Sequence, residues 1–219
     1  MVLAPPPLER QLKILAIDTA GWCTSVALWE DGNVLSFEER HQEREQAALL
    51  PQMTEEVLAG HAFDQILVNV GPGSFTGIRV GIAFAKGLSL GLGLPLKGMD
   101  SFTATYLNLE ASQDVLILLE ARRQDVYGRY FQKGFFHPPA SFTRTDIEQI
   151  LALPTPPPLA GSGLHPFLEG LPFIERVPLF QGANALAYGF FKNPASLIEP
   201  LPFYVREADV SVSQVVHNS

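Results

Sequence analysis

A glycine-rich segment between two apolar stretches is the feature that most constrains the fold of this 219-residue sequence. Residues 66–70 are almost entirely apolar, which is typical of a central parallel strand. The loop Gly71-Pro72-Gly73-Ser74-Phe75-Thr76-Gly77 follows, and residues 76–90 are apolar over a helical length. Because glycines allow a sharp turn and a helix start favours an anion, the segment predicts a strand, a tight loop and a buried helix that can face a phosphate.

The elements around this segment predict one mixed sheet. Residues 12–18, 24–29 and 34–39 read as three antiparallel strands, with a hairpin turn at Asp31-Gly32. A helix to about Leu58 has one apolar face, and Pro51 either kinks it or marks its true start. Residues 94–99 return to the sheet, and Asp100 or Ser101 can cap a helix to about Leu109. This β-β-β-α-β-α-β-α order is that of an actin-like, ribonuclease-H-like subdomain.

The rest of the chain predicts a second, smaller subdomain of the same α/β class. Residues 115–120 and 126–131 read as strands, Thr145 opens a capping-box pattern with Glu148, and Asn184 can cap a helix to Phe191. The expected division is a disordered extension at 1–11, a first subdomain at 12–110, a second at 111–207 and a tail at 208–219.

Composition excludes several classes of function. A net charge of −8 and a pI of about 5.1 disfavour direct nucleic-acid binding. A single cysteine suits a reducing compartment, and the N-terminal residues lack a signal-peptide pattern. The apolar run at 78–96 contains Arg79, Lys86 and several glycines, which argues against a membrane span. We expect a cytoplasmic protein.

Two interpretations of the loop stay open. Either it faces a phosphate, or it is a strand-to-helix turn without a ligand. No lysine of the Walker type follows the glycines, so the chain is not a P-loop nucleotidase. Glu120 ends the corresponding strand of the second half and can supply a second acid, although no adenosine clamp is recognisable. The candidate phosphate-facing residues are Asp18, Thr19, Ser25, Gly71, Gly73, Ser74 and Thr76.

No catalytic or metal site is expected. The five histidines show neither helical pair spacing nor an HExxH motif, and Cys23 has no paired histidine signal in the sequence. We therefore expect Cys23 to be structural and the isolated chain to hold no cofactor.

The helix at 76–90 predicts a protein partner. It is apolar nearly all the way round, which requires cover on two sides. Gly77, Gly81 and Ala85 form a stripe of small residues at which another helix can approach closely. The alternative is that the chain's own first helix supplies the cover. The candidate partner-binding residues are Leu49, Leu50, Met53, Val57, Gly77, Ile78, Gly81, Ile82 and Ala85.

These residues resemble the bacterial TsaB family, also called YeaZ. The match includes the strand at 14–19, the loop at 71–77 with its continuation to Gly81, Ala121-Arg122, Gly161-Ser162-Gly163 and Pro202-Phe203-Tyr204-Val205-Arg206. Two positions depart from the family pattern: Gln46 stands where many members carry histidine, and Glu120 where many carry aspartate.

The resemblance implies an actin-like fold and a non-catalytic scaffold in the complex that adds threonylcarbamoyl to adenosine beside the anticodon of tRNA. It implies docking to a catalytic TsaD subunit through the first two helices, action together with a TsaE ATPase, and tRNA contact only within the complex. A homodimer of the free chain and ATP or ADP at the partner interface stay open. The superfamily label "glycoprotease-like" finds no support in these residues. The alternative function is an autonomous nucleotide hydrolase or kinase of the same fold.

Overall fold

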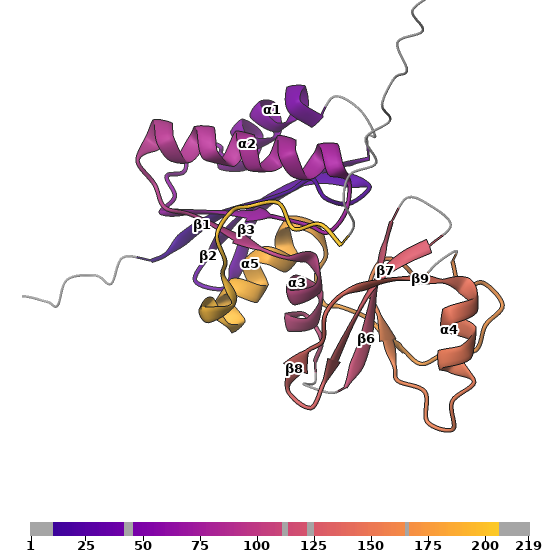
Figure 1. Cartoon of the computed structure of the whole chain (residues 1–219). Helices are drawn as coiled ribbons and strands as arrows, with labels where there is room; N and C mark the ends of the chain where they lie inside the picture. The colour runs from indigo at the N-terminus through magenta and orange to yellow at the C-terminus, as the bar shows by residue number, and fades with distance from the viewer. Residues whose placement is uncertain (1–10, 42–45, 111–113, 122–124, 165–166, 206–219) are drawn as a thin grey trace, which may run out of the picture.

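Two mixed sheets with flanking helices make up the protein (Figure 1). The computed structural model describes residues 11–41, 46–110, 114–121, 125–164 and 167–205. The first sheet has the order β3-β2-β1-β4-β5, formed by β1 (Lys13–Asp18), β2 (Cys23–Glu30), β3 (Asn33–His41), β4 (Gln65–Asn69) and β5 (Leu96–Met99). The three N-terminal strands are antiparallel, whereas β4 and β5 run parallel to β1. The predicted strands and the order of elements are confirmed.

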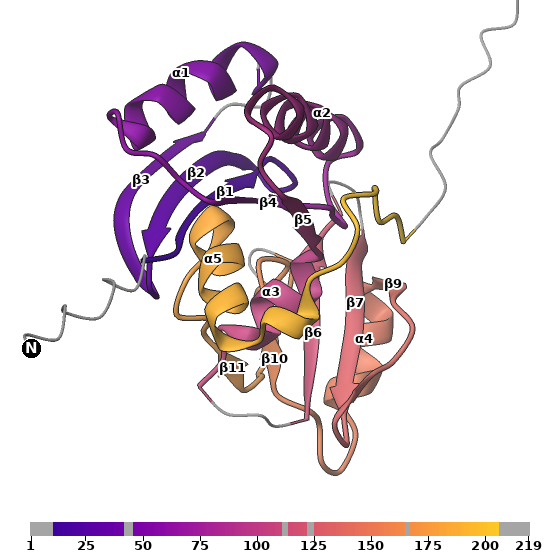
Figure 2. The same cartoon turned by 90° about the vertical axis from the view of Figure 1, so that its left-hand side faces the viewer.

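Helices cover both faces of the first sheet (Figure 2). Alternate residues of β1 point to opposite faces, so Leu15 and Ile17 pack under α1 (Gln46–Leu58) and α2 (Phe75–Leu92), while Ile14 and Ala16 pack against α5 (Gly182–Lys192). This two-sided burial explains why the strands read as continuous apolar runs. The sheet is therefore the middle layer of three.

The second sheet has the order β11-β10-β6-β7-β8, and β9 also pairs with β7. Its strands are β6 (Val115–Glu120), β7 (Asp125–Gln132), β8 (Phe135–Phe136), β9 (Ala140–Thr143), β10 (Leu159–Ala160) and β11 (Glu175–Arg176). One face packs on α4 (Arg144–Leu151), and the other packs on Phe102 and Tyr106 of α3 (Ser101–Leu107). The short helix α3 therefore lies between the two sheets.

The C-terminal part of the chain returns to the first sheet. α5 packs on β1 and β2, and a 3-10 turn follows at Pro194–Ser196. Gly98 then pairs with Ile198, and the amide of Phe203 donates to the carbonyl of Val70 (2.8 Å). The part of the chain that packs around the second sheet therefore ends before α5, whereas the second subdomain was expected to span 111–207. The expected extension at 1–11 lies outside the described residues except for Gln11, and the expected tail at 208–219 lies wholly outside them.

Two local predictions were wrong because tertiary contacts decided them. The capping box lies at Thr143 and Asp146, not at Thr145 and Glu148, since Thr143 is the extended residue that ends β9. Asn184 does not cap α5; it lies within the helix, and its side chain accepts a hydrogen bond from the indole of Trp29 (2.7 Å). Of the two alternatives for Pro51, the structure excludes the start of the helix, because Pro51 lies within α1.

Helix α2 serves as a core helix of the first sheet. By length and composition it is the one described helix that could cross a membrane, and 28% of its 18 residues are buried. Ile78, Ile82 and Ala85 are buried against the sheet. Ser74 caps its start by accepting from the amide of Gly77, and Gly93 ends it in the left-handed conformation (φ 67°) that favours glycine. Its apolar character thus reflects packing on the sheet.

Candidate functional site

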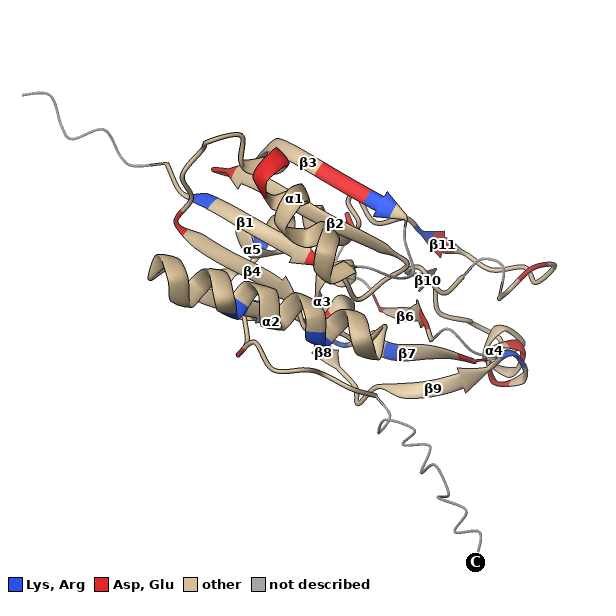
Figure 3. Ribbon diagram, turned by 90° about the horizontal axis from the view of Figure 1, so that it is seen from above, with Lys and Arg blue, Asp and Glu red and all other residues tan. Residues whose placement is uncertain are grey.

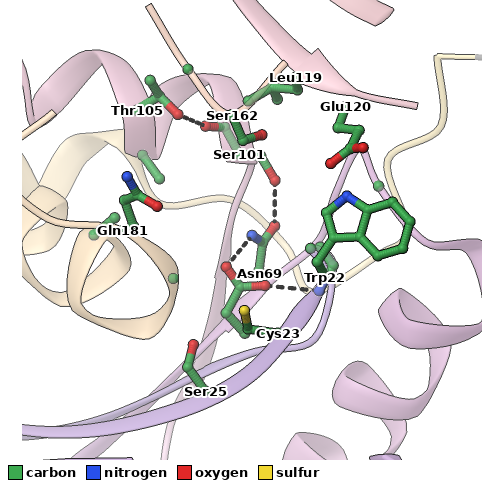
Figure 4. Close-up of a pocket in the computed structure, with 18 of the residues that line it drawn as sticks. Trp22, Cys23, Ser25, Asn69, Ser101, Thr105, Leu119, Glu120, Ser162 and Gln181 are labelled. Carbon is green, nitrogen blue, oxygen red and sulfur yellow. Dashed lines mark hydrogen bonds between the residues drawn. The ribbon is translucent and has the colours of Figure 1, made fainter. Parts of the chain in front are cut away.

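A cavity of about 300 Å³ lies between the two sheets, at the carboxyl end of β1 (Figure 4). One wall comes from the first sheet and the loop before α2, with Asp18, Cys23 and Asn69. The opposite wall comes from the second sheet, with Leu119 and Glu120 at the end of β6. The position matches the general rule that α/β proteins bind ligands beyond the carboxyl ends of their strands, where loops leave a crevice.

A hydrogen-bonded network fixes the floor of the cavity. The Asp18 carboxylate accepts from the Asn69 side-chain amide (2.9 Å) and from the Ala20 amide (2.8 Å). Asn69 in turn accepts from the Gly71 amide (2.8 Å) and the Ser101 hydroxyl (3.0 Å). Burial raises the pKa of Asp18 although both hydrogen bonds oppose that shift. Each oxygen of Asp18 thus already has a partner, and the side chain is held rigidly.

The glycine-rich loop is packed against the chain itself. A Cβ on Gly73 would lie 2.2 Å from the carbonyl oxygen of Ala20, and the amide of Ser74 donates to that same oxygen (2.7 Å). The amides of Gly71 and Gly77 donate to Asn69 and Ser74. The amides of Gly71, Ser74 and Gly77 are therefore used internally, which favours the turn without a ligand over the phosphate-facing loop.

The candidate phosphate-facing residues divide into two groups. Asp18, Ser25, Gly73 and Ser74 line the cavity, and so does Glu120, the expected second acid. Thr19 and Gly71 are buried away from the cavity lining, and Thr76 is exposed on α2. Sequence reasoning did not identify the following lining residues, because they are scattered over a strand end, a helix and loops and share no motif that marks one site: Trp22, Asn69, Ser101, Thr105, Ser162 and Gln181.

The charge of the cavity is negative. The carboxylates of Asp18, Glu39 and Glu120 all line it, and none of the described residues in its lining is a lysine, arginine or histidine. A phosphate placed among these groups would be repelled unless a cation accompanied it. The cavity as it stands is suited to a cation or a neutral polar molecule.

The small-residue stripe of α2 faces the chain's own sheet, so the predicted partner-facing orientation was wrong. A Cβ on Gly81 would lie 2.3 Å from the hydroxyl of Thr19, and one on Gly77 would lie 2.0 Å from the Thr19 carbonyl oxygen. The Thr19 hydroxyl donates to the carbonyl of Gly77 (2.7 Å). The stripe lets α2 approach the end of β1 rather than a second protein.

Most of the candidate partner-binding residues are likewise internal. Leu49 is only partly buried. The others are fully or almost fully buried on the inner faces of α1 and α2: Leu50, Met53, Val57, Gly77, Ile78, Gly81, Ile82 and Ala85. The outward face of α2 carries a shallow apolar groove lined by Phe84, Gly87, Leu88, Gly91 and Leu92. Figure 3 shows α2 without an acidic residue and with two basic bands, and the basic residues of this helix are Arg79 and Lys86.

Cys23 has a histidine neighbour that the sequence did not reveal. Its sulfur lies 3.1 Å from Nδ1 of His41, which stands directly opposite it on β3, and Glu39 lies beside both. Burial and the nearby carboxylates of Glu39 and Asp18 raise the pKa of the Cys23 thiol to about 11. A test for helical spacing could not find this group because its members meet across two strands.

Comparison with known proteins gives consistent matches. A family model described as TsaD, tRNA N6-adenosine threonylcarbamoyltransferase, matches residues 36–136. The tRNA threonylcarbamoyladenosine biosynthesis protein TsaB of Escherichia coli is 35% identical over 137 residues, covering 58% of this chain and 59% of that protein. An uncharacterised protein of Mycobacterium leprae is 31% identical over 207 residues, covering 90% of this chain and 55% of that protein. The matching stretches thus span little more than half the length of these two relatives.

Solved structures give the same result for the fold. YeaZ from Pseudomonas aeruginosa superposes with a TM-score of 0.65 at 25% identity, over 88% of this chain and 99% of that one. A ROK family protein from Streptococcus pneumoniae superposes with a TM-score of 0.52 at 12% identity, over 83% and 97%. The second likeness concerns the fold alone. The predicted actin-like arrangement of two mixed sheets is confirmed.

Proposed function

We propose that the chain belongs to the TsaB/YeaZ family and acts as a non-catalytic scaffold subunit in the synthesis of threonylcarbamoyladenosine on tRNA. The similarity to the E. coli tRNA threonylcarbamoyladenosine biosynthesis protein TsaB supports a role in this synthesis. The scaffold role rests on one observation about this chain: the outward face of α2 is apolar and has no cover among the described residues. Phe84, Leu88 and Leu92 line that groove, and Leu92 is 56% exposed.

The proposed partner of this groove is a TsaD-like catalytic subunit that has an apolar helix of its own. Gly87 and Gly91 lie in the groove with nothing within 4 Å of a Cβ placed on either, so a helix can approach the backbone of α2 there. Leu49 of α1 extends the same side of the molecule. A second copy of this chain can occupy the groove when the catalytic subunit is absent, and a TsaE-like ATPase and the tRNA join only the full complex.

The alternative function, an autonomous nucleotide hydrolase or kinase, has less support. Three carboxylates line the cavity without a basic residue in the described lining, and the loop amides are used within the chain. With a net charge of −8, the chain alone is also unsuited to bind the tRNA backbone. We place the function in the cytoplasm and expect ATP or ADP, if bound, at the partner interface.

A reconstituted reaction tests the proposal. Purified TsaD-like and TsaE-like subunits are incubated with tRNA, ATP and an enzymatic source of activated threonylcarbamoyl, with and without this chain, and threonylcarbamoyladenosine is measured by mass spectrometry. We expect the modified nucleoside only when the chain is present. Full modification without the chain would contradict the scaffold role, and magnesium-dependent ATP turnover by the isolated chain would favour the alternative.

A further inference from the structure

We propose that Cys23, Glu39 and His41 form a zinc-binding site at the rim of the cavity between the sheets. The three residues come from the neighbouring strands β2 and β3, in which Cys23 pairs with His41 and Ser25 pairs with Glu39. Glu39 and His41 are two residues apart and therefore project from the same face of β3. The backbone register thus places a thiol, an imidazole and a carboxylate in one cluster.

The distances suit a small metal ion. The sulfur of Cys23 lies 3.6 Å from Nε2 of His41, and the same Nε2 lies 3.8 Å from Oε1 of Glu39. One donor atom from each residue can be chosen so that all lie within 4.8 Å of one another. Tetrahedral zinc bonds of about 2.3 Å to sulfur and 2.0–2.1 Å to nitrogen place two ligand atoms about 3.5 Å apart. Small side-chain rotations can therefore complete the site.

The side chains are free to make those rotations. The His41 side chain is 80% exposed and the Glu39 side chain 35% exposed, so neither is locked by core packing. Cys23 is half-buried and fixed by its strand. One anchored ligand and two adjustable ones allow the cluster to close on an ion without moving the sheet.

The local charge favours a cation. The carboxylates of Glu39 and Asp18 line the same cavity as Cys23. These negative charges attract a divalent cation, and such an ion binds a cysteine as its thiolate.

The ligand set selects zinc over the common alternatives. A thiolate is a poor ligand for magnesium and calcium, whereas Cys, His and Glu are all established zinc ligands. Three protein ligands leave one of four positions for water or another donor. Because Cys23 and Glu39 also line the cavity, an ion held by them lies at its rim. This inference concerns a site separate from the α2 groove and does not depend on the proposed scaffold role.

Metal titration tests the site. The full chain, without an affinity tag, is freed of metal and titrated with zinc against a chromophoric chelator. We expect one ion to bind, and Cys23→Ser, Glu39→Gln and His41→Gln each to weaken binding. Loss of an outer-shell residue typically costs 10–100-fold in metal affinity, so loss of a direct ligand should cost about 100-fold for Cys23 and at least about 10-fold for the others. His61→Gln, a substitution of an exposed histidine outside the cluster, is the matched control and should bind as the wild type does.

Cobalt provides an independent readout. Cobalt bound to wild type should show a thiolate-to-metal absorption band that Cys23→Ser removes. Equal affinity in wild type, Cys23→Ser and His41→Gln would overturn the proposal, as would the absence of that band in wild type. If Cys23→Ser lowers the melting temperature, the exposed His41→Gln variant still decides the question.

Discussion

The two faces of α2 carry similar small and apolar residues but have opposite roles. On the inner face, Gly77 and Gly81 let the helix contact Thr19 so closely that no side chain fits. On the outer face, Gly87 and Gly91 have open space around them, and Leu92 is largely exposed. Glycine thus allows close internal packing on one side of the helix and leaves space for a partner on the other. Only the position of the sheet distinguishes the two.

The largest expected effect is on the inner face. Gly81→Leu forces a side chain into the space of the Thr19 hydroxyl, and overpacking of this kind costs about 3 kcal/mol of unfolding free energy or more. For a chain of this size, a melting scan should show a fall of about 6–12 °C. Gly87→Leu is the matched control and should not lower the melting temperature. If Gly81→Leu instead melts normally but loses the partner, the stripe faces outward.

The second effect is on the outer face. Leu92→Glu places a charge in the apolar groove, and loss of a central contact there should cost about 2 kcal/mol, or roughly thirtyfold, in affinity for the TsaD-like subunit. Calorimetric titration measures the affinity. Leu90→Glu is the control, since Leu90 is 88% exposed on the same helix but does not line the groove. Equal losses in both variants would show that the groove has no special role, and a falling melting temperature would assign Leu92 to the core.

A smaller effect tests the contact that holds the inner face. Thr19→Val removes the hydroxyl that donates to the Gly77 carbonyl while keeping the side-chain shape, and should cost about 1 kcal/mol of unfolding free energy. Urea denaturation gives the value. Thr76→Val, on the exposed first turn of α2, should change it by less than about 0.5 kcal/mol. Indistinguishable midpoints for the two variants would mean that Thr19 does not anchor the helix.

The smallest effect has the opposite sign. Gly87→Ala adds a methyl group in open space and replaces the poorest helix former other than proline, so it should stabilise the chain by about 0.5–1 kcal/mol. Gly81→Ala makes the same chemical change on the inner face and should destabilise it, because its Cβ would meet Thr19. Thermal melts of the two variants side by side would contradict the comparison if both moved in the same direction.

The sequence by itself determined the order and type of the elements. Alternation and apolar runs in residues 12–39 and 66–70, together with glycines at the loop, are local signals, and the strands and helices formed there with small shifts of their ends. The resemblance to the family also followed from local motifs. Carboxylates at strand ends were recognisable, and Asp18 and Glu120 do line the cavity.

Only the tertiary structure decided which surfaces and side chains meet. A helix that is apolar all round gives no indication of which side lies on the sheet, so the orientation of α2 could not be read from its periodicity. The pairing of Cys23 with His41 depends on the register of β2 and β3, and the contact of Trp29 with Asn184 joins residues 155 positions apart. Strand register and long-range contacts are set by the packing of the whole chain, and that is why sequence reasoning located the cavity's acids but missed the cluster at its rim.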